Sequence, residues 1–139
     1  MIVVDADTLM LFVHGDEAVR SRLLATPPEE VAIPAVVAFE VFAALRRADA
    51  SARRRAQLRR LLDGVRTPWL GLAEADVAAS LEVELEQAGH ALGPLDVMLA
   101  ATALCYGATL VTPRPAVFAP VPGLETVDWT SDAVVEVGS

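Results

Sequence analysis

The stretch GPLDVMLAATALCYGATLVT, residues 93–112, carries the strongest indication of the fold. Its first part is apolar nearly all round, which predicts a buried helix that Asp96 opens and Gly107 ends. The segment ATLVT, residues 108–112, follows at once and is typical of a buried strand. A buried helix leading directly into a buried strand predicts a sheet that helices cover.

The same alternation extends outward along the chain. Further strands are expected at residues 2–4, 31–33, 65–70 and 125–129. Helices are expected at residues 7–12, capped by Asp7 or Thr8, and at residues 16–25, 34–48, 51–65 and 74–88. Pro113 and Pro115 predict a loop. The predicted class is therefore α/β, with one domain over residues 1–130, a mainly parallel sheet, and a frayed tail at residues 131–139.

Composition narrows the possible classes of protein. The 139 residues are 54% hydrophobic, and the mean hydropathy of +0.45 indicates a folded chain. No apolar run is long enough for a membrane span, and the start MIVVDAD lacks the basic region of a signal peptide. The single Cys105 excludes an internal disulfide, so we expect a cytoplasmic protein that does not bind membranes.

Three acids interrupt apolar sequence. Asp5 directly follows the strand IVV, where ligands of a doubly wound sheet bind, although a turn or helix cap explains such an acid equally well. Glu40 is the only charge in VAIPAVVAFEVFAAL, and a buried charge is costly unless it is paired or binds a metal. The alternatives for Glu40 are a narrow solvent stripe or a pair with Arg47. Asp96 precedes a buried helix and could simply cap it.

Convergent carboxylates suit hard-cation chemistry. Mg²⁺ or Mn²⁺ prefers oxygen ligands, and such an ion activates water and stabilises charge on a phosphodiester. His14 and His90 are the only imidazoles, and neither lies near a nucleophile motif. The sequence therefore favours a metal-dependent site over nucleophilic catalysis by a serine or cysteine.

Four segments resemble the PIN-domain family, and specifically its VapC-type toxins. They are MIVVDADTLM, AIPAVVAFEVFAAL, GPLDVMLAATALCYGATLVT and FAPVPGLETVDW, which together run from Met1 to about Trp129. The resemblance implies a three-layer α/β/α sandwich and an acidic pocket for Mg²⁺ or Mn²⁺. It also implies endoribonuclease activity, a small antitoxin partner and a homodimer.

The resemblance also implies roles for individual residues. Asp5 and Asp96 correspond to metal ligands, and Glu40 corresponds to a ligand or a water-positioning acid. Asp7 and Thr112 match polar residues that support the site. One departure is Arg114, which stands where many members carry a fourth acid. Arginine cannot bind Mg²⁺, but it could neutralise the pocket or hold a phosphate.

The charge distribution bears on nucleic-acid binding. The net charge of −8 and pI near 4.6 oppose general binding to phosphates, but seven of the eleven basic residues form a basic island. These are Arg46, Arg47, Arg53, Arg54, Arg55, Arg59 and Arg60. The island is either a solvated helix face paired with acids or a phosphate rail for RNA, in which Arg46, Arg47 and Arg53 to Arg55 are the candidate contacts.

Two other functions stay open from the sequence alone. The same fold could serve as a catalytically weak or inactive module that binds RNA or protein, which Arg114 and the acidic net charge favour slightly. The same acids could also serve a DNA nuclease or a phosphatase, because carboxylates alone do not distinguish phosphodiester classes.

Overall fold

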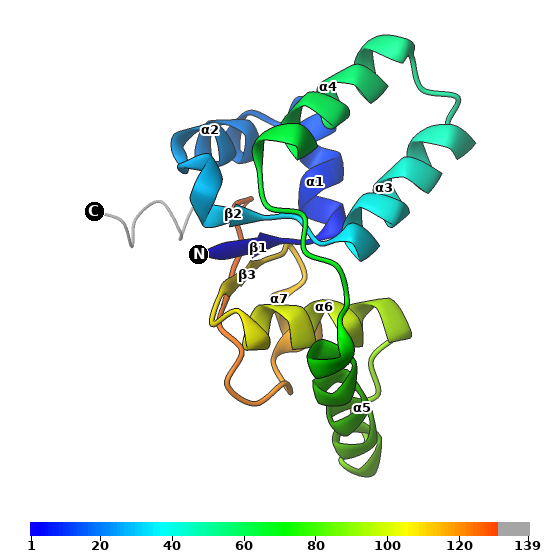
Figure 1. Ribbon diagram of the computed structural model, residues 1–139, viewed down its shortest axis with the longest axis vertical. Helices are drawn as coiled ribbons and strands as arrows, with labels where there is room; N and C mark the ends of the chain where they lie inside the picture. The colour runs from blue at the N-terminus through cyan, green and yellow to red at the C-terminus, as the bar shows by residue number, and fades with distance from the viewer. Residues whose placement is uncertain (131–139) are drawn as a thin grey trace.

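A four-stranded parallel sheet lies at the centre of the computed structural model, which describes residues 1–130 (Figure 1). Its strands are β1 (Ile2–Val4), β2 (Val31–Ala32), β3 (Thr109–Val111) and β4 (Thr126–Val127). They lie in the order β2-β1-β3-β4, so β1 and β3 occupy the middle. The expected parallel sheet is confirmed; the expected frayed tail lies outside the described residues.

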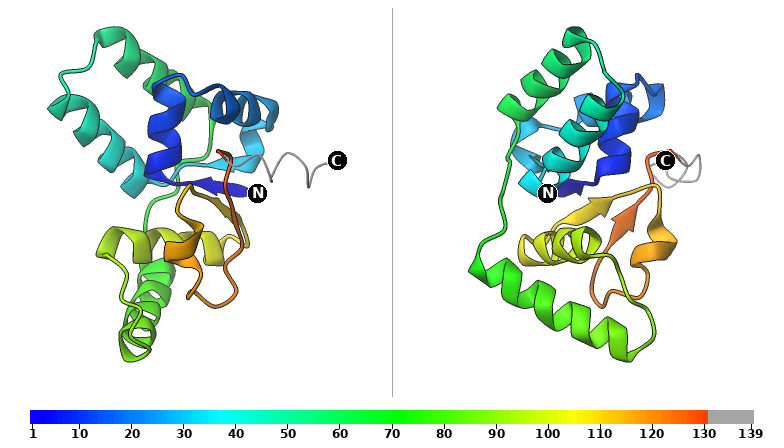
Figure 2. Two further views of the ribbon diagram at one scale, coloured as in Figure 1. Left: turned by 180° about the vertical axis from the view of Figure 1, so that it is seen from behind. Right: turned by 90° about the vertical axis from the view of Figure 1, so that its right-hand side faces the viewer.

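Helices cover both faces of this sheet, as the views in Figure 2 show. One layer contains α1 (Ala6–Val13), α2 (Glu17–Ala25), α3 (Ala35–Arg47) and α4 (Ala52–Gly64), with the short 3-10 helix η1 (Pro28–Glu30) before β2. The other layer contains α5 (Leu72–Gln87), α6 (Pro94–Cys105) and the single turn α7 (Pro115–Phe118). The molecule is therefore an α/β/α sandwich, as the sequence and its resemblance predicted.

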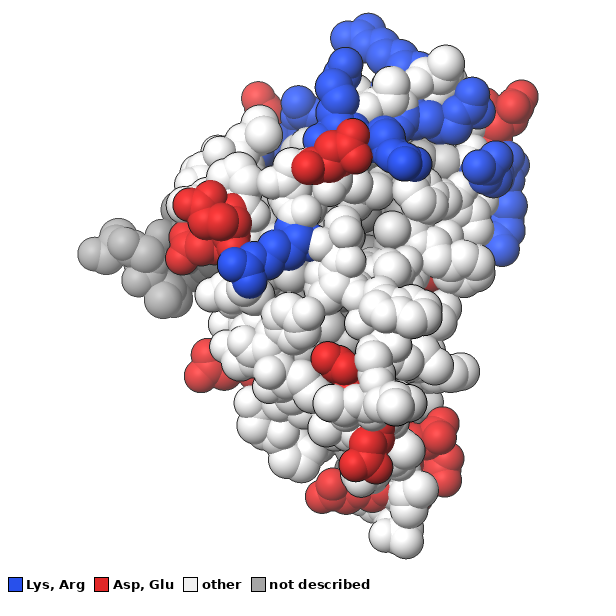
Figure 3. All heavy atoms as spheres, viewed as in Figure 1, with Lys and Arg blue, Asp and Glu red and all other residues white. Residues whose placement is uncertain are grey.

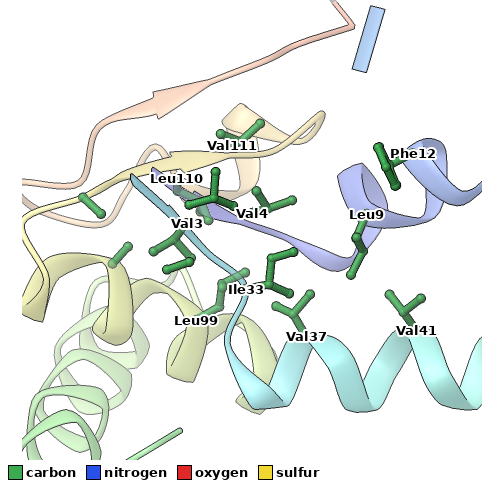
Figure 4. Close-up of a cluster of buried hydrophobic side chains, with 14 of the residues drawn as sticks. Val3, Val4, Leu9, Phe12, Ile33, Val37, Val41, Leu99, Leu110 and Val111 are labelled. Carbon is green, nitrogen blue, oxygen red and sulfur yellow. The ribbon is translucent and has the colours of Figure 1, made fainter. Parts of the chain in front are cut away.

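The central strands are apolar because helices bury them on both sides. Val3, Val4 and Leu110 are fully buried in the sheet (Figure 4). Side chains of α1 and α3, including Leu9 and Val37, pack against them, and Leu99 packs from α6. Each such side chain contributes about 1.5–3 kcal/mol by leaving water. This core fixes the ends of β1 and β3, where the candidate site lies.

Two expected elements are wrong. Residues 65–70 do not form a strand; only Arg66 makes an isolated bridge, to Ala32. Pro68 in this segment has no N–H to donate to a ladder, which limits the pairing. The expected loop at Pro113 and Pro115 contains α7, which begins at Pro115 because proline fits the first position of a helix.

Among the described residues, none of the helices combines the length and the hydrophobicity that a membrane crossing requires.

Candidate metal centre

The candidate site begins at the edge where β1 and β3 end together. Asp5 directly follows β1, and Thr112 directly follows β3. The Asp5 N–H donates to the carbonyl oxygen of Val111 at 3.1 Å, which ties the two strand ends together. Ligands of parallel sheets bind beyond these carboxyl ends, so the position of Asp5 agrees with the expected crevice.

Asp5 caps α1, which corrects the expectation that Asp7 or Thr8 does so. Its Oδ1 accepts a hydrogen bond from the Thr8 N–H at 2.8 Å, and its side chain is 0% exposed. Its Oδ2 is buried and has no hydrogen-bond partner among the described residues. Burial raises the pKa of Asp5, against the nearby polar groups of Thr112 and Thr8, which lower it. One carboxylate oxygen of Asp5 thus caps α1, and the other has no hydrogen-bond partner within the described residues.

Three further acids come from three different helices and line one pocket of ≈ 410 Å³. Asp7 lies in α1, Glu40 in α3 and Asp96 in α6. One interpretation of the sequence held that Asp96 caps its helix, and this is wrong. Gly93 is the cap, and Asp96 lies in the first turn. A carboxylate in the first turn is favoured by the helix dipole, and here it also faces the pocket.

Glu40 is half-buried in α3 between the buried residues Val37 and Val41. It forms no ion pair with Arg47, and among the described residues it has no hydrogen-bond or ion-pair partner. Burial raises the pKa of Glu40, and the carboxylates of Asp96 and Asp7 raise it further. The predicted alternative that Glu40 pairs with Arg47 is therefore wrong. The other alternative, a solvent-exposed position, holds in part: the side chain is partly exposed, and it faces the acidic pocket.

Arg114 reaches into the middle of these acids. Its Nη1 and Nη2 donate to the two carboxylate oxygens of Asp96 at 3.3 and 3.2 Å. Its Nε lies 2.7 Å from Asp7 Oδ2, and its Nη2 lies 3.9 Å from Asp5 Oδ2. The hydrogen bonds to Asp96, opposed by partial burial, raise the pKa of Arg114. The arginine therefore neutralises part of the acidic pocket.

Thr112 holds the turn that carries Arg114. The Thr112 side chain is buried, and its hydroxyl oxygen accepts a hydrogen bond from the Arg114 N–H at 3.0 Å. Its own N–H donates to Val127 on β4 at 2.9 Å. Thr112 thus connects the sheet to the arginine, a contact that the sequence alone did not reveal.

The donor chemistry of this pocket fits a hard divalent cation. All four acids offer oxygen ligands, and the unpartnered Oδ2 of Asp5 is a buried acceptor that an ion could satisfy. Yet among residues 1–130, no three acid, histidine or cysteine side chains stand close enough to hold an ion as they are placed. The Arg114 guanidinium lies between the carboxylates of Asp7 and Asp96 in this arrangement.

The basic island lies apart from the acids, on the surface of α4 and the last turn of α3. Arg53, Arg54 and Arg55 are exposed on α4, and Arg46 and Arg47 are exposed at the end of α3. Arginines gather over these helices in Figure 3. Within the described chain the island forms a single ion pair, from Arg59 to Asp63 at 3.9 Å. A face fully paired with acids is therefore not what the structure shows.

A second, more apolar pocket of ≈ 610 Å³ lies between α3 and α4. Its lining includes Phe39, Phe42 and Leu62, together with Arg46 and Arg59. Of this lining, the sequence singled out Arg46 and Arg59 as part of the basic island, but not Phe39 and Phe42, which stand three positions apart on one face of a helix. Phe39 is 60% exposed, so this apolar surface is open to solvent in the single chain.

The chain is similar to known proteins both in sequence and in fold. The family model of the PIN domain matches residues 2–113. The chain belongs to the PIN domain family, a family of nucleases. A comparison with curated protein sequences gave no match.

Solved structures share the fold at low sequence identity. The VapBC complex from Salmonella typhimurium bound to DNA aligns with a TM-score of 0.83 and 22% identity, covering 92% of this chain and 97% of that one. DNA-bound VapBC2 from Rickettsia felis aligns with a TM-score of 0.81 and 23% identity, covering 93% of this chain and 99% of that one. The toxin VapC20 from Mycobacterium tuberculosis cleaves the sarcin-ricin loop. It aligns with a TM-score of 0.62 and 18% identity, covering 78% of this chain and 85% of that one. At these identities the likeness establishes the fold alone.

Proposed function

We propose that the chain is a metal-dependent endoribonuclease of the VapC type, the toxin of a type II toxin–antitoxin pair acting in the cytoplasm. The observation that carries the proposal is the convergence of Asp5, Asp7, Glu40 and Asp96 at one end of the sheet. The buried, unpartnered oxygen of Asp5 supports it, because an orphaned buried carboxylate is costly unless something binds it.

Asp5, Glu40 and Asp96 would hold Mg²⁺ or Mn²⁺, with Asp7 in support. A divalent cation supplies Lewis acidity, which makes water nucleophilic at neutral pH and stabilises charge on a phosphodiester. Asp5 is the most rigid of the three acids, since the cap of α1 and the β3 hydrogen bond fix its backbone and one oxygen. A rigid first ligand reduces the entropy lost on binding.

Glu40 is suited to orient the attacking water. Its carboxylate faces the pocket without a hydrogen-bond partner in the described part of the chain, so it is free to accept a hydrogen bond from a water molecule there. In the reaction the water oxygen bonds to phosphorus, the bond from phosphorus to the 3′ oxygen breaks, and that oxygen takes up a proton. The products therefore carry a 5′-phosphate and a 3′-hydroxyl.

Arginines beyond the pocket would bring RNA to an acidic site that otherwise repels it. Arg46, Arg47 and Arg53 to Arg55 are exposed and offer this charge. RNA is favoured over DNA by the fold shared with VapC20, whose described target is the sarcin-ricin loop. The preferred RNA sequence does not follow from these residues.

A small antitoxin is the proposed protein partner. The structures from Salmonella typhimurium and Rickettsia felis are complexes of a toxin and an antitoxin. In this chain the apolar pocket between α3 and α4 is suited to an amphipathic segment of such a partner. A short neighbouring gene for a DNA-binding protein would support this assignment, and co-expression should then give a stable complex. The expected homodimer stays a prediction.

The direct test is cleavage of RNA in the presence of Mg²⁺ or Mn²⁺. Asp96→Asn should lower the cleavage rate by at least about 100-fold, as loss of a charged group that acts on the transition state does. Asp76→Asn, an exposed aspartate on α5, is the matched control and should cleave as the wild type does. Chelation by EDTA should abolish cleavage. Full metal-dependent activity in Asp96→Asn would contradict the assignment.

The alternative function, a PIN-domain module without strong catalysis, has one observation in its favour. Arg114 engages both oxygens of Asp96, so the pocket is partly neutralised without an ion. The two functions differ in metal binding. Calorimetry with Mn²⁺ should detect binding by a nuclease, whereas absence of binding at millimolar metal would support the module.

A further inference from the structure

The guanidinium of Arg114 is held by the carboxylates that the proposed function assigns to a divalent cation. It makes a two-pronged contact with Asp96, and its Nε lies 2.7 Å from Asp7 Oδ2. Two-pronged pairs between arginine and a carboxylate are among the strongest side-chain hydrogen bonds. As a result, both oxygens of Asp96 are already engaged before any ion arrives.

The fit of the guanidinium is incomplete at Asp5. The Asp5 side chain is 0% exposed, and its Oδ2 lies 3.9 Å from the Arg114 Nη2, too far for a hydrogen bond. A divalent cation binds oxygens at about 2.0–2.6 Å and can satisfy several carboxylates at once. The unpartnered oxygen shows that arginine neutralises the pocket without satisfying its deepest acid.

Arg114 is also free to leave. Its side chain is 39% exposed, although its Nε atom is buried, and its guanidinium lies 5.7 Å from the ring centre of the buried Phe118 on α7. Its backbone is anchored by the Thr112 hydroxyl, so the side chain can swing while the strand end stays in place. Exposed side chains change rotamer in nanoseconds or less. Displacement of the guanidinium therefore does not require the backbone at Arg114 to move.

We propose that Arg114 is the resident cation of this pocket and sets its affinity for metal: a divalent ion binds only when the guanidinium leaves Asp96 and Asp7. The inference rests on the proposed function, because it concerns the same acids. The guanidinium limits repulsion among the carboxylates of the metal-free protein, and the ion must compete with it. Arg114 is thus a residue that determines metal affinity, and its effect should be measurable without RNA.

The first experiment measures Mn²⁺ binding by calorimetry for the wild type and for Arg114→Gln. The variant should bind Mn²⁺ at least about tenfold more tightly, because the ion no longer displaces a charge-assisted pair. Arg20→Gln is the matched control. Arg20 is also half-buried over a phenylalanine ring, 5.0 Å from the centre of Phe12, and forms no ion pair within the described chain. This control removes the same charge and should bind as the wild type does.

The outcomes separate this inference from the proposed function. Equal Mn²⁺ affinity in the wild type and Arg114→Gln would overturn the inference and leave the nuclease assignment standing. A similar gain in Arg20→Gln would also overturn it, because general loss of charge would then explain the effect. Absence of Mn²⁺ binding in every variant would overturn both.

A second experiment uses the wild type alone and so does not depend on how Arg114→Gln folds. The Nε–H signal of Arg114 can be followed by ¹⁵N nuclear magnetic resonance while Mg²⁺ is added. Release of the guanidinium should shift this signal and speed its exchange with water, in proportion to the metal bound. If Mg²⁺ binds and the Arg114 signal stays unchanged, the guanidinium and the ion coexist, and the inference is overturned.

Discussion

The two carboxylate oxygens of Asp5 make different contacts. Oδ1 accepts a hydrogen bond from the Thr8 N–H and so caps α1, whereas Oδ2 is buried and has no hydrogen-bond partner in residues 1–130. In the sequence, capping and metal binding look like alternatives for one acid, but here the capping residue keeps a second oxygen for the proposed metal. Aspartate can serve both because its two oxygens point in different directions from one short side chain.

Asp5 should make folding stability depend on pH in the metal-free protein. Its folded-state pKa is raised above 3.8 by burial, so below that pH the carboxyl is protonated in both states and has no effect. As the pH rises above 3.8, the unfolded chain ionises first, and stability falls until the folded-state pKa is reached. Asp5→Asn, which keeps a capping oxygen, should therefore be more stable than the wild type at neutral pH.

The measurement is thermal unfolding in EDTA between about pH 4 and pH 7, where the wild type should lose stability relative to Asp5→Asn. Asp16→Asn is the control, because Asp16 caps α2 in the same way at a half-buried position. If Asp5→Asn unfolds at a lower temperature than the wild type throughout, the buried charge of Asp5 stabilises the fold, against the expectation.

At the scale of elements, segments of uninterrupted apolar sequence were predictable, and the two segments that contain Pro68 and Pro115 were not. The helix at 94–105 and the strand at 2–4 follow from uninterrupted apolar sequence, which needs a covered position whatever its neighbours. The segment around Pro68 and the turn of α7 are short, and their states depend on contacts from elsewhere in the chain. Local sequence cannot specify such contacts.

The site shows the same division. Asp5, Glu40 and Asp96 could be singled out because each interrupts apolar sequence. The reach of Arg114 to Asp7 and Asp96 could not, because it depends on where the turn after β3 places a long side chain. The Thr112 hydroxyl that fixes this turn is likewise a matter of tertiary geometry.

The helix α4 offers a test of RNA binding by a single element. Replacement of Arg53, Arg54 and Arg55 with glutamine should weaken RNA binding and flatten its dependence on salt. For each phosphate that is no longer neutralised, the slope of log K against log salt should fall by about 0.7 for single-stranded RNA. The titration should be repeated with Arg66→Gln, an exposed arginine outside the basic island. An unchanged slope in the triple variant would reject α4 as the RNA-binding element.

At the scale of the whole molecule, charge is unevenly distributed, although both helical layers carry exposed acids, such as Glu29 on η1 and Asp76 on α5. Arginines gather over α3 and α4, whereas acids including Asp76 and Glu82 lie on α5 (Figure 3). A net charge of −8 therefore conceals a local basic surface over α3 and α4. Under the proposed function, this local basic surface would bring RNA to a protein whose net charge is acidic.

The proposed metal centre lies where the layers meet, at the ends of β1 and β3. There the fold collects acids from α1, α3 and α6 around an arginine. Crystals grown with Mn²⁺ would test this centre most directly, by anomalous diffraction. We expect a manganese peak among Asp5, Glu40 and Asp96, with the Arg114 guanidinium turned away from Asp96. The proposed metal centre would be contradicted if the protein cleaves RNA in a metal-dependent manner but the manganese peak lies elsewhere or is absent at these acids.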